Sequence, residues 1–218
     1  MTNYEAYKGL YSSLNDVNYF EIAYTLKREF GDAGLYRDLP LYNFVDNHDV
    51  DRVASQLKNK AHLYPLYILL MSMPGVPSIY YGSEWGLEGK RLPHSDEPVR
   101  PSLELETAAA SSAEPHLVET IRRLTYIRHN NKALKEGDYQ TLLTRHQQFA
   151  FSRRFEDEIS IVVLNAANEA VSVEIPLPVQ TGILKDSLNP ADTFKFSGGK
   201  VTLPMNANWG RILRVESH

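Results

Sequence analysis

The chain of 218 residues contains no cysteine, which excludes disulfides, thiolate metal sites and a cysteine nucleophile. This absence also favours an intracellular, cytoplasmic location. Charge of one sign is not in large excess, since the formal net charge is -4 and the basic residues are scattered. The chain therefore lacks the basic patch that nucleic acids or anionic membranes attract, and we expect neither as a partner.

A long uninterrupted hydrophobic run is also missing. The most apolar stretch, Leu63 to Tyr81, is about as long as a membrane span, but three prolines interrupt it. We expect a buried helix over residues 61–73 and a buried strand over residues 76–81 instead. The N-terminus has neither the basic nor the apolar segment of a secretory signal. With 43% hydrophobic residues, the chain has enough apolar material for a globular fold.

Helix and strand patterns alternate over the first part of the chain. Apolar residues recur at helical spacing between Asn15 and Phe30 and again between Leu117 and His129. Two short apolar runs, Leu39–Val45 and Val76–Tyr81, are typical of buried parallel strands. This alternation predicts an α/β fold built from βα units around a parallel sheet.

Short strands separated by turn residues fill the remainder of the chain. The predicted strands are Gln148–Arg154, Ile159–Leu164, Val171–Ile175, Gly182–Lys185, Thr193–Phe196, Lys200–Leu203 and Arg211–Val215. Evenly spaced strands of this kind indicate an all-β unit, an antiparallel sandwich. We therefore expect two domains, residues 1–135 and residues 136–218.

Four polar residues, Asp46, Asn47, His48 and Asp49, directly follow the first predicted strand. In parallel βα sheets and barrels, ligands bind at this carboxyl end of the strands. Carboxylate, amide and imidazole groups suit hydrogen bonding to a polyhydroxylated ligand and stabilisation of positive charge. The alternative is that an Asp or Asn caps the next helix or turn and His48 is a surface residue. No His-x-x-x-His spacing supports a transition-metal site.

Two ordered motifs resemble those of a known family. Phe44–Asp49, which reads Phe-Val-Asp-Asn-His-Asp, resembles the seventh-strand motif of α-amylase-family barrels. Gly75–Glu84, which reads Gly-Val-Pro-Ser-Ile-Tyr-Tyr-Gly-Ser-Glu, is similar to the family's segment around the eighth strand. The resemblance implies the C-terminal portion of a (β/α)8 TIM barrel, roughly strands 6–8 with their helices, over residues 1–135. A C-terminal antiparallel β-sandwich domain would follow over residues 136–218.

The resemblance also implies roles for individual residues. Asp49 matches the third catalytic carboxylate, which stabilises the oxocarbenium-like transition state. His48 matches an imidazole that binds sugar hydroxyls at the same subsite, and Asn47 would shape the turn that presents the pair. Arg52 either holds a carboxylate or a sugar hydroxyl, or is a solvated residue at a helix start. Trp85 either stacks on a sugar ring or packs against the protein.

The two carboxylates that cleave the glycosidic bond are not recognisable in the chain. A retaining reaction needs both, about 5 Å apart, and in the family they precede the Asn-His-Asp motif. We expect Glu5, Glu21 and Glu29 to be solvated charges. The resemblance thus implies the C-terminal part of a retaining, α-glucan-acting glycoside hydrolase of the α-amylase or maltodextrin-degrading type, inactive as an isolated chain.

The implied ligand is an α-glucan or a malto-oligosaccharide. No cofactor is expected and no metal on this chain, although the resemblance allows a calcium ion in the parent enzyme. Two or three barrel strands expose apolar edges, which predicts self-association through the open barrel edge. The alternative function is a non-catalytic carbohydrate-binding or assembly module.

Overall fold

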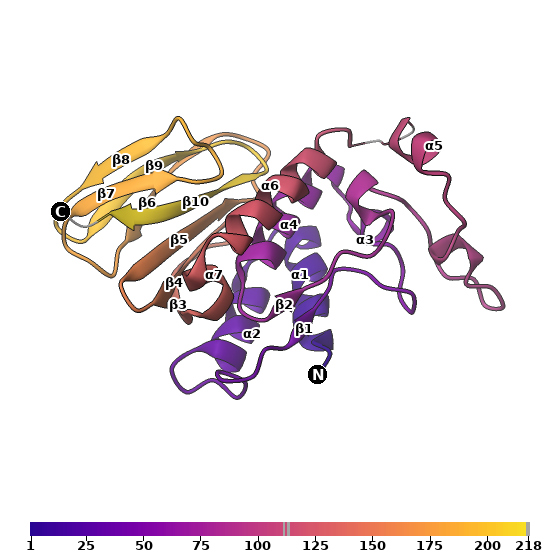
Figure 1. The fold of residues 1–218 in the computed structure, drawn as a ribbon, viewed down its shortest axis with the longest axis horizontal. Helices are drawn as coiled ribbons and strands as arrows, with labels where there is room; N and C mark the ends of the chain where they lie inside the picture. The colour runs from indigo at the N-terminus through magenta and orange to yellow at the C-terminus, as the bar shows by residue number, and fades with distance from the viewer. Residues whose placement is uncertain (111, 113, 217–218) are drawn as a thin grey trace.

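The structure is a computed structural model that describes residues 1–110, 112 and 114–216. Helices dominate the first part and strands the second (Figure 1). The helices are α1 (Tyr4–Asn15), α2 (Phe20–Phe30), α3 (Val53–Gln56), α4 (Leu63–Ser72), α5 (Leu105–Ala110), α6 (Leu117–His129) and α7 (Lys132–Glu136), with short 3-10 turns η1 (Lys60–His62), η2 (Ser83–Trp85) and η3 (Glu97–Val99). The strands are β1 (Tyr42–Asn43), β2 (Val76–Pro77), β3 (Asp138–Thr144), β4 (Gln148–Phe155), β5 (Glu158–Asn165), β6 (Val171–Pro176), β7 (Gly182–Asp186), β8 (Thr193–Phe196), β9 (Lys200–Met205) and β10 (Trp209–Glu216).

Helix α1 adds to the predicted elements. Its buried stripe consists of Ala6, Leu10 and Leu14, which follow one another at intervals of four residues. The helix begins after Asn3, whose side-chain oxygen accepts a hydrogen bond of 2.9 Å from the Ala6 backbone N–H. A cap and a regular apolar stripe therefore explain this helix, although the rest of the segment is polar.

The strands β1 and β2 pair in parallel, with Tyr42 opposite Val76. Both predicted strands are present but much shorter than the apolar runs that indicated them. Between α4 and β2 the backbone of Gly75 has φ +100°, a conformation that favours glycine. A Cβ atom there would lie 2.5 Å from the Leu41 carbonyl oxygen and from Asn43 Nδ2. Only glycine thus allows the chain to return this close to β1.

Helix α4, within the most apolar stretch of the chain, lies in the protein core. Its ten residues are almost all buried, and Leu66, Ile68 and Leu70 have no solvent exposure. Among residues 1–110, 112 and 114–216, no helix has the length and apolar character that crossing a membrane would require.

Two antiparallel sheets make up the second part of the chain. One has the strand order β3-β4-β5-β10-β7-β8, and the other pairs β6 with β9. Their facing side chains, among them Ile161, Val173 and Leu203, share one apolar cluster, as in a β-sandwich. All seven predicted strands of this part are confirmed, and β3 is added to them.

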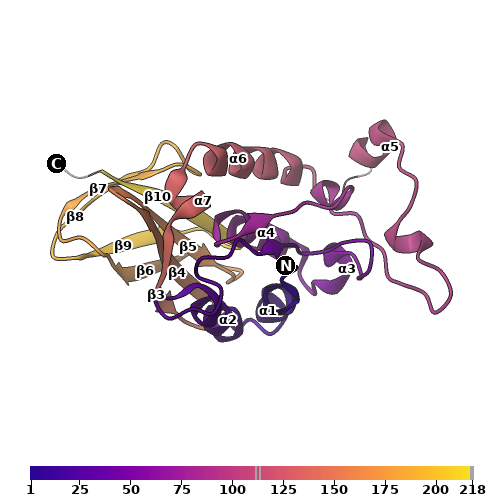
Figure 2. The same ribbon diagram turned by 60° about the horizontal axis from the view of Figure 1, so that its bottom comes forward.

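The other face of the six-stranded sheet packs against the helices (Figure 1, Figure 2). Phe149 and Phe151 of β4 share a second apolar cluster with Leu26 of α2, Leu66 of α4 and Leu124 of α6. The change from helices to strands near residue 135 therefore does not separate two independent hydrophobic cores. The division into two domains at that point stays a prediction.

Candidate functional site

The Asp-Asn-His-Asp run lies just beyond β1, at the carboxyl end of the two parallel strands. Asp46 is buried, whereas the side chains of His48 and Asp49 are 58% and 51% exposed. The chain thus passes from the core to the surface within four residues. This places an imidazole and a carboxylate at the end of the sheet where ligands bind in parallel folds.

Asp46 anchors the base of this site. Its Oδ2 accepts a hydrogen bond of 2.9 Å from the Val53 backbone N–H at the start of α3. Ser83 Oγ lies 2.7 and 2.8 Å from the two carboxylate oxygens and donates to them. Burial raises the pKa of Asp46, while the two donors and the nearby Arg52 guanidinium oppose that rise. The carboxylate thereby joins β1, α3 and the segment after β2.

His48 and Asp49 lie next to each other at the surface. His48 Nε2 is 3.3 Å from Asp49 Oδ2. The Asn47 side-chain oxygen accepts a hydrogen bond of 2.7 Å from the Asp49 backbone N–H, which closes a tight Asx turn. Asn47 is therefore engaged within the turn that presents the pair, and contact of these three residues with a sugar stays a prediction.

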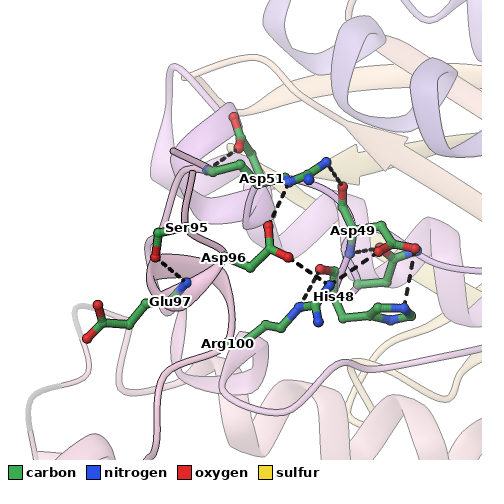
Figure 3. A network of polar contacts seen from close by, with 9 residues as sticks. His48, Asp49, Asp51, Ser95, Asp96, Glu97 and Arg100 are labelled. Carbon is green, nitrogen blue, oxygen red and sulfur yellow. Dashed lines mark hydrogen bonds and ion pairs between the residues drawn. The ribbon is translucent and has the colours of Figure 1, made fainter. Parts of the chain in front are cut away.

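Two arginines of the segment after β2 hold this turn from the outside. Arg100 Nε donates to the His48 carbonyl oxygen at 2.9 Å, and its Nη2 is 3.4 Å from Asp49 Oδ1 and 3.1 Å from Asp96 Oδ2 (Figure 3). Arg91 Nη1 donates to the Asp49 carbonyl oxygen at 2.9 Å, and its Nε is 3.2 Å from Asp96 Oδ1. Each ion pair is solvent-exposed and contributes little alone, but together they tie the segment to the turn.

We call the three residues that hold the turn, Arg91, Asp96 and Arg100, the arginine clamp. We did not identify them from the sequence. They lie in a loop without periodicity, about 40 to 50 residues after the motif that they contact. The signal that could have revealed part of it is the spacing of Asp96 and Arg100, an i,i+4 pair across η3.

Arg52 lies beneath the surface, at the N-terminal end of α3. Its side chain has no solvent exposure, and Nη1 donates to the Tyr81 carbonyl oxygen at 2.7 Å. The guanidinium carbon is 4.2 Å from the centre of the Tyr80 ring, a cation–π contact. Arg52 does lie at a helix start, but the alternative that it is solvated is wrong, because the Gly75–Glu84 motif covers the guanidinium. Its binding to a carboxylate or a sugar stays a prediction.

Trp85 is half-buried in η2 and lines a separate hollow. The hollow has a volume of ≈ 460 Å³, and Leu87 and Leu103 line it as well. In the described part of the chain, no ring contact or hydrogen bond joins Trp85 to His48 or Asp49. The structure therefore does not bring Trp85 into the polar cluster, and its stacking on a sugar stays a prediction.

Glu29 is buried, so the expectation that it is a solvated charge is wrong. Its Oε2 accepts a hydrogen bond of 2.8 Å from Asn3 Nδ2, and Asn3 also donates to Asn43 Oδ1 at 3.0 Å. Burial raises the pKa of Glu29. Glu5 and Glu21 are accessible to solvent, as expected.

The residues around the turn do not fit a metal site. Asp46 is engaged by amide and hydroxyl donors, Asp49 by Arg100, and Asp51 Oδ1 accepts from the Arg91 backbone N–H at 2.8 Å. Within the described residues, no group of three or more His, Cys, Asp or Glu side chains is arranged to hold a metal ion. The oxygen-rich run therefore offers no calcium cage.

Comparison with known proteins identifies relatives for most of the chain. A family model of the α-amylase catalytic domain matches residues 34–114, which include both motifs and the arginine clamp. An amylopullulanase of Thermoanaerobacterium saccharolyticum is 28% identical over 186 residues, or 79% of this chain and 14% of the relative. A cyclomaltodextrin glucanotransferase of Niallia circulans is 28% identical over 152 residues, or 67% of this chain and 20% of the relative. The chain thus spans less than a quarter of these relatives.

Solved structures share the fold over the full length of the chain. An Anoxybacillus α-amylase matches 100% of this chain and 47% of its own, with a TM-score of 0.81 and 21% identity. The α-amylase from Geobacillus thermoleovorans, complexed with acarbose, matches 99% of this chain and 48% of its own, with a TM-score of 0.83 and 18% identity. The fold is therefore the expected one, the C-terminal portion of a (β/α)8 barrel followed by an antiparallel β-sandwich. In its matched segment, its relatives and its fold, the chain resembles the C-terminal portion of α-amylase-family glycoside hydrolases.

Proposed function

We propose that the chain carries the Asp49 and His48 side of the active site of a retaining glycoside hydrolase that acts on α-glucans. The observation that supports this most is the half-exposed carboxylate–imidazole pair at the carboxyl end of β1, anchored by Asp46 below and Arg100 at the rim. A carboxylate held in this way can stabilise the positive charge of an oxocarbenium-like transition state. The neighbouring imidazole can hydrogen-bond sugar hydroxyls.

The proposed ligand is an α-glucan or a malto-oligosaccharide. Relatives of this chain are an amylopullulanase, cyclomaltodextrin glucanotransferases and α-amylases, and one structural neighbour is complexed with acarbose. Within the proposal, Asp49 stabilises the transition state, His48 binds sugar hydroxyls and Asn47 orients both. Arg52 supports the site from beneath, and Trp85 provides a stacking face at the edge.

We also propose that the chain does not hydrolyse glucans by itself. Hydrolysis with retention requires a nucleophile and a separate acid about 5 Å apart. The carboxylates closest to Asp49 in sequence are already engaged: Asp46 is buried with Ser83, and Asp51 accepts from the Arg91 backbone. The nucleophile and the acid would therefore come from other segments of the parent enzyme.

The test combines turnover and binding on the purified chain. We expect no reducing sugar to be released from maltodextrin, and weak binding of maltoheptaose in titration calorimetry. The Asp49→Asn variant keeps the size of the side chain but removes its charge, and should weaken this binding. Hydrolysis that disappears in Asp49→Asn would contradict the proposed inactivity. Binding that is unchanged in Asp49→Asn would contradict the proposed role of Asp49.

A second candidate function, an assembly module, is favoured by one observation. Tyr4, Tyr42 and Val76 are 50%, 42% and 50% exposed around the short parallel sheet. Exposed apolar side chains beside open strand edges promote association. Under this candidate, the chain would self-associate through the open barrel edge. Light scattering should give a mass above 24.8 kDa, and a monomeric mass at every concentration would contradict self-association.

A further inference from the structure

A groove runs between helix α2 and strand β3, separate from the Asp49 site. Its volume is ≈ 910 Å³, within the size range of small-molecule sites. Strand β3 is an edge of the six-stranded sheet, and α2 lies along it (Figure 2). None of the lining residues belongs to the Asp46–Asp51 run or to the arginine clamp. The groove is therefore a second concave surface of the molecule.

One wall of the groove carries two exposed aromatic rings. Phe20 and Tyr24 of α2 are 49% and 67% exposed. They are four residues apart, so both rings lie on the same side of the helix, about 6 Å apart along its axis. Ile22 and Leu26 of the same helix are fully buried, whereas the Phe20 ring is half-exposed and meets the His146 ring edge to face, with the ring centres 5.4 Å apart. Solvent-exposed aromatic rings in a groove offer flat apolar faces for a ligand.

The opposite wall carries uncharged hydrogen-bonding side chains. Thr141 and Thr144 of β3 line the groove, and Thr141 Oγ1 shares a hydrogen bond of 3.0 Å with the Tyr139 hydroxyl. A β-bulge between Thr141 and Leu143 breaks the alternation of the strand, so that Thr141 and Thr144 face the same way. Both pair with residues of β4 that face the helices, Thr141 with Phe151 and Thr144 with Phe149. The bulge thus places the Thr144 side chain on the face of the sheet that packs against the helices.

The charge of the groove is mixed and confined to one end. Lys27, Arg28 and Asp32 are its charged lining residues, and Arg28 is paired with Glu5. Such a surface has no excess of one sign to attract a phosphate-rich or strongly basic ligand. Two aromatic faces opposite two hydroxyls match a neutral, polyhydroxylated ligand.

We propose that this groove is a second carbohydrate site, which binds a segment of a neutral α-glucan chain outside the active site. The rings of Phe20 and Tyr24 pack against the apolar faces of sugar rings, and Thr141 and Thr144 hydrogen-bond hydroxyls. The choice of an α-glucan, rather than another neutral glycan, rests on the proposed function. A second site would hold a polymeric substrate near the enzyme while the active site turns over.

The experiment measures maltoheptaose binding by amide chemical-shift perturbation on the full chain. Phe20→Ala with Tyr24→Ala should weaken groove binding about tenfold, and Thr144→Val, which removes a hydroxyl but keeps the shape, about threefold. The matched control is Tyr126→Ala, because Tyr126 is a 70% exposed helical tyrosine outside the groove. Its affinity should equal that of the unmodified chain.

Two arms keep this inference separate from the proposed function. In Asp49→Asn, perturbations of α2 and β3 should persist with unchanged affinity, even if those around His48 disappear. Maltoheptaose that perturbs only the His48 region would overturn the second site and leave the proposed function intact. Equal affinities of the groove variant and the Tyr126→Ala control would also overturn it. If the edge strand β3 instead pairs with an extended peptide, maltoheptaose would cause no amide shifts in β3. That result would also overturn the second carbohydrate site.

Discussion

At the scale of single residues, the Ser83 hydroxyl is the side-chain donor that satisfies the buried carboxylate of Asp46. Replacement of Ser83 by Ala removes this donor and leaves the carboxylate with the Val53 N–H and the Arg52 charge. We expect the free energy of unfolding to fall by about 1–3 kcal/mol, measured by urea titration. Ser172→Ala, at an exposed position of β6, is the control and should change it by less than about 0.5 kcal/mol. Equal effects of the two substitutions would contradict the anchoring role of Asp46.

His62 makes the stability depend on pH. Its ring is buried, with Nε2 3.1 Å from the Ala166 carbonyl oxygen, and burial lowers its pKa below 6.5. The unfolded chain therefore takes up this proton at a higher pH than the folded protein. The contribution of His62 to stability is complete above the unfolded value and is lost as the pH falls through the folded value.

We expect the free energy of unfolding to fall between about pH 7 and about pH 5, and the fall to be smaller in His62→Gln. Urea titrations at both pH values measure this difference. His129→Gln, at an exposed histidine that ends α6, is the control for the other histidines and should keep the dependence of the unmodified chain. An undiminished fall in His62→Gln would show that another group is responsible.

The candidate site could be predicted only where the signal is local. Asp49 and His48 lie in a contiguous motif that follows an apolar run, which predicts their place at the end of a strand. Arg100 could not be assigned, because it reaches the turn through the folding of a long loop. The burial of Arg52 depends on the Tyr80 ring and the Tyr81 carbonyl, almost 30 residues away. Neither dependence is visible in the sequence around the arginine.

At the scale of elements, the C-terminal end of α4 is held by two buried arginines. Arg153 of β4 donates to the Ser72 carbonyl oxygen at 2.8 Å and to the Leu134 carbonyl oxygen at 2.9 Å. Arg128 of α6 donates to the Met71 carbonyl oxygen at 2.9 Å. Carbonyl groups at this end of a helix lack partners within the helix, and the helix dipole favours positive charge there. Burial lowers the pKa of both guanidinium groups.

Arg153→Met tests this arrangement. The apolar stem remains, but the buried carbonyl oxygens lose their donors. We expect the free energy of unfolding to fall by about 3 kcal/mol, measured by chemical denaturation. The adjacent Arg154 is exposed on the same strand, so Arg154→Met provides the matched control and should have little effect. A similar loss in both variants would indicate that the strand position, rather than the helix end, matters.

Prediction of the elements succeeded where a periodic pattern is long and unbroken. The helix over Leu117–His129 has the predicted bounds because its apolar stripe runs through more than three turns. Strand β3 was missed because its bulge between Thr141 and Leu143 breaks the alternation that marks a strand. The lengths of β1 and β2 were overestimated, because the apolar runs continue into buried segments whose backbone does not pair with another strand.

At the scale of the whole molecule, the shared core predicts a single unfolding transition. Phe149 has no solvent exposure, and its ring stacks 5.7 Å from that of Tyr19 at the start of α2. Phe149→Ala leaves a cavity between sheet and helices, and should lower the free energy of unfolding by about 3–5 kcal/mol. Far-ultraviolet and near-ultraviolet circular dichroism should shift together, with one calorimetric transition. Two transitions, of which only one moves, would contradict the shared core.

The same shared core limits which β domains can replace this one. The face of the sheet that carries Phe149 and Phe151 packs against α2, α4 and α6 in one hydrophobic cluster. A β domain transplanted from a distant relative would meet helices shaped to another set of side chains. Chimeras joined near residue 135 should therefore lose solubility unless both faces are exchanged. In evolution, the last barrel helices and the sheet are then expected to be inherited as one unit.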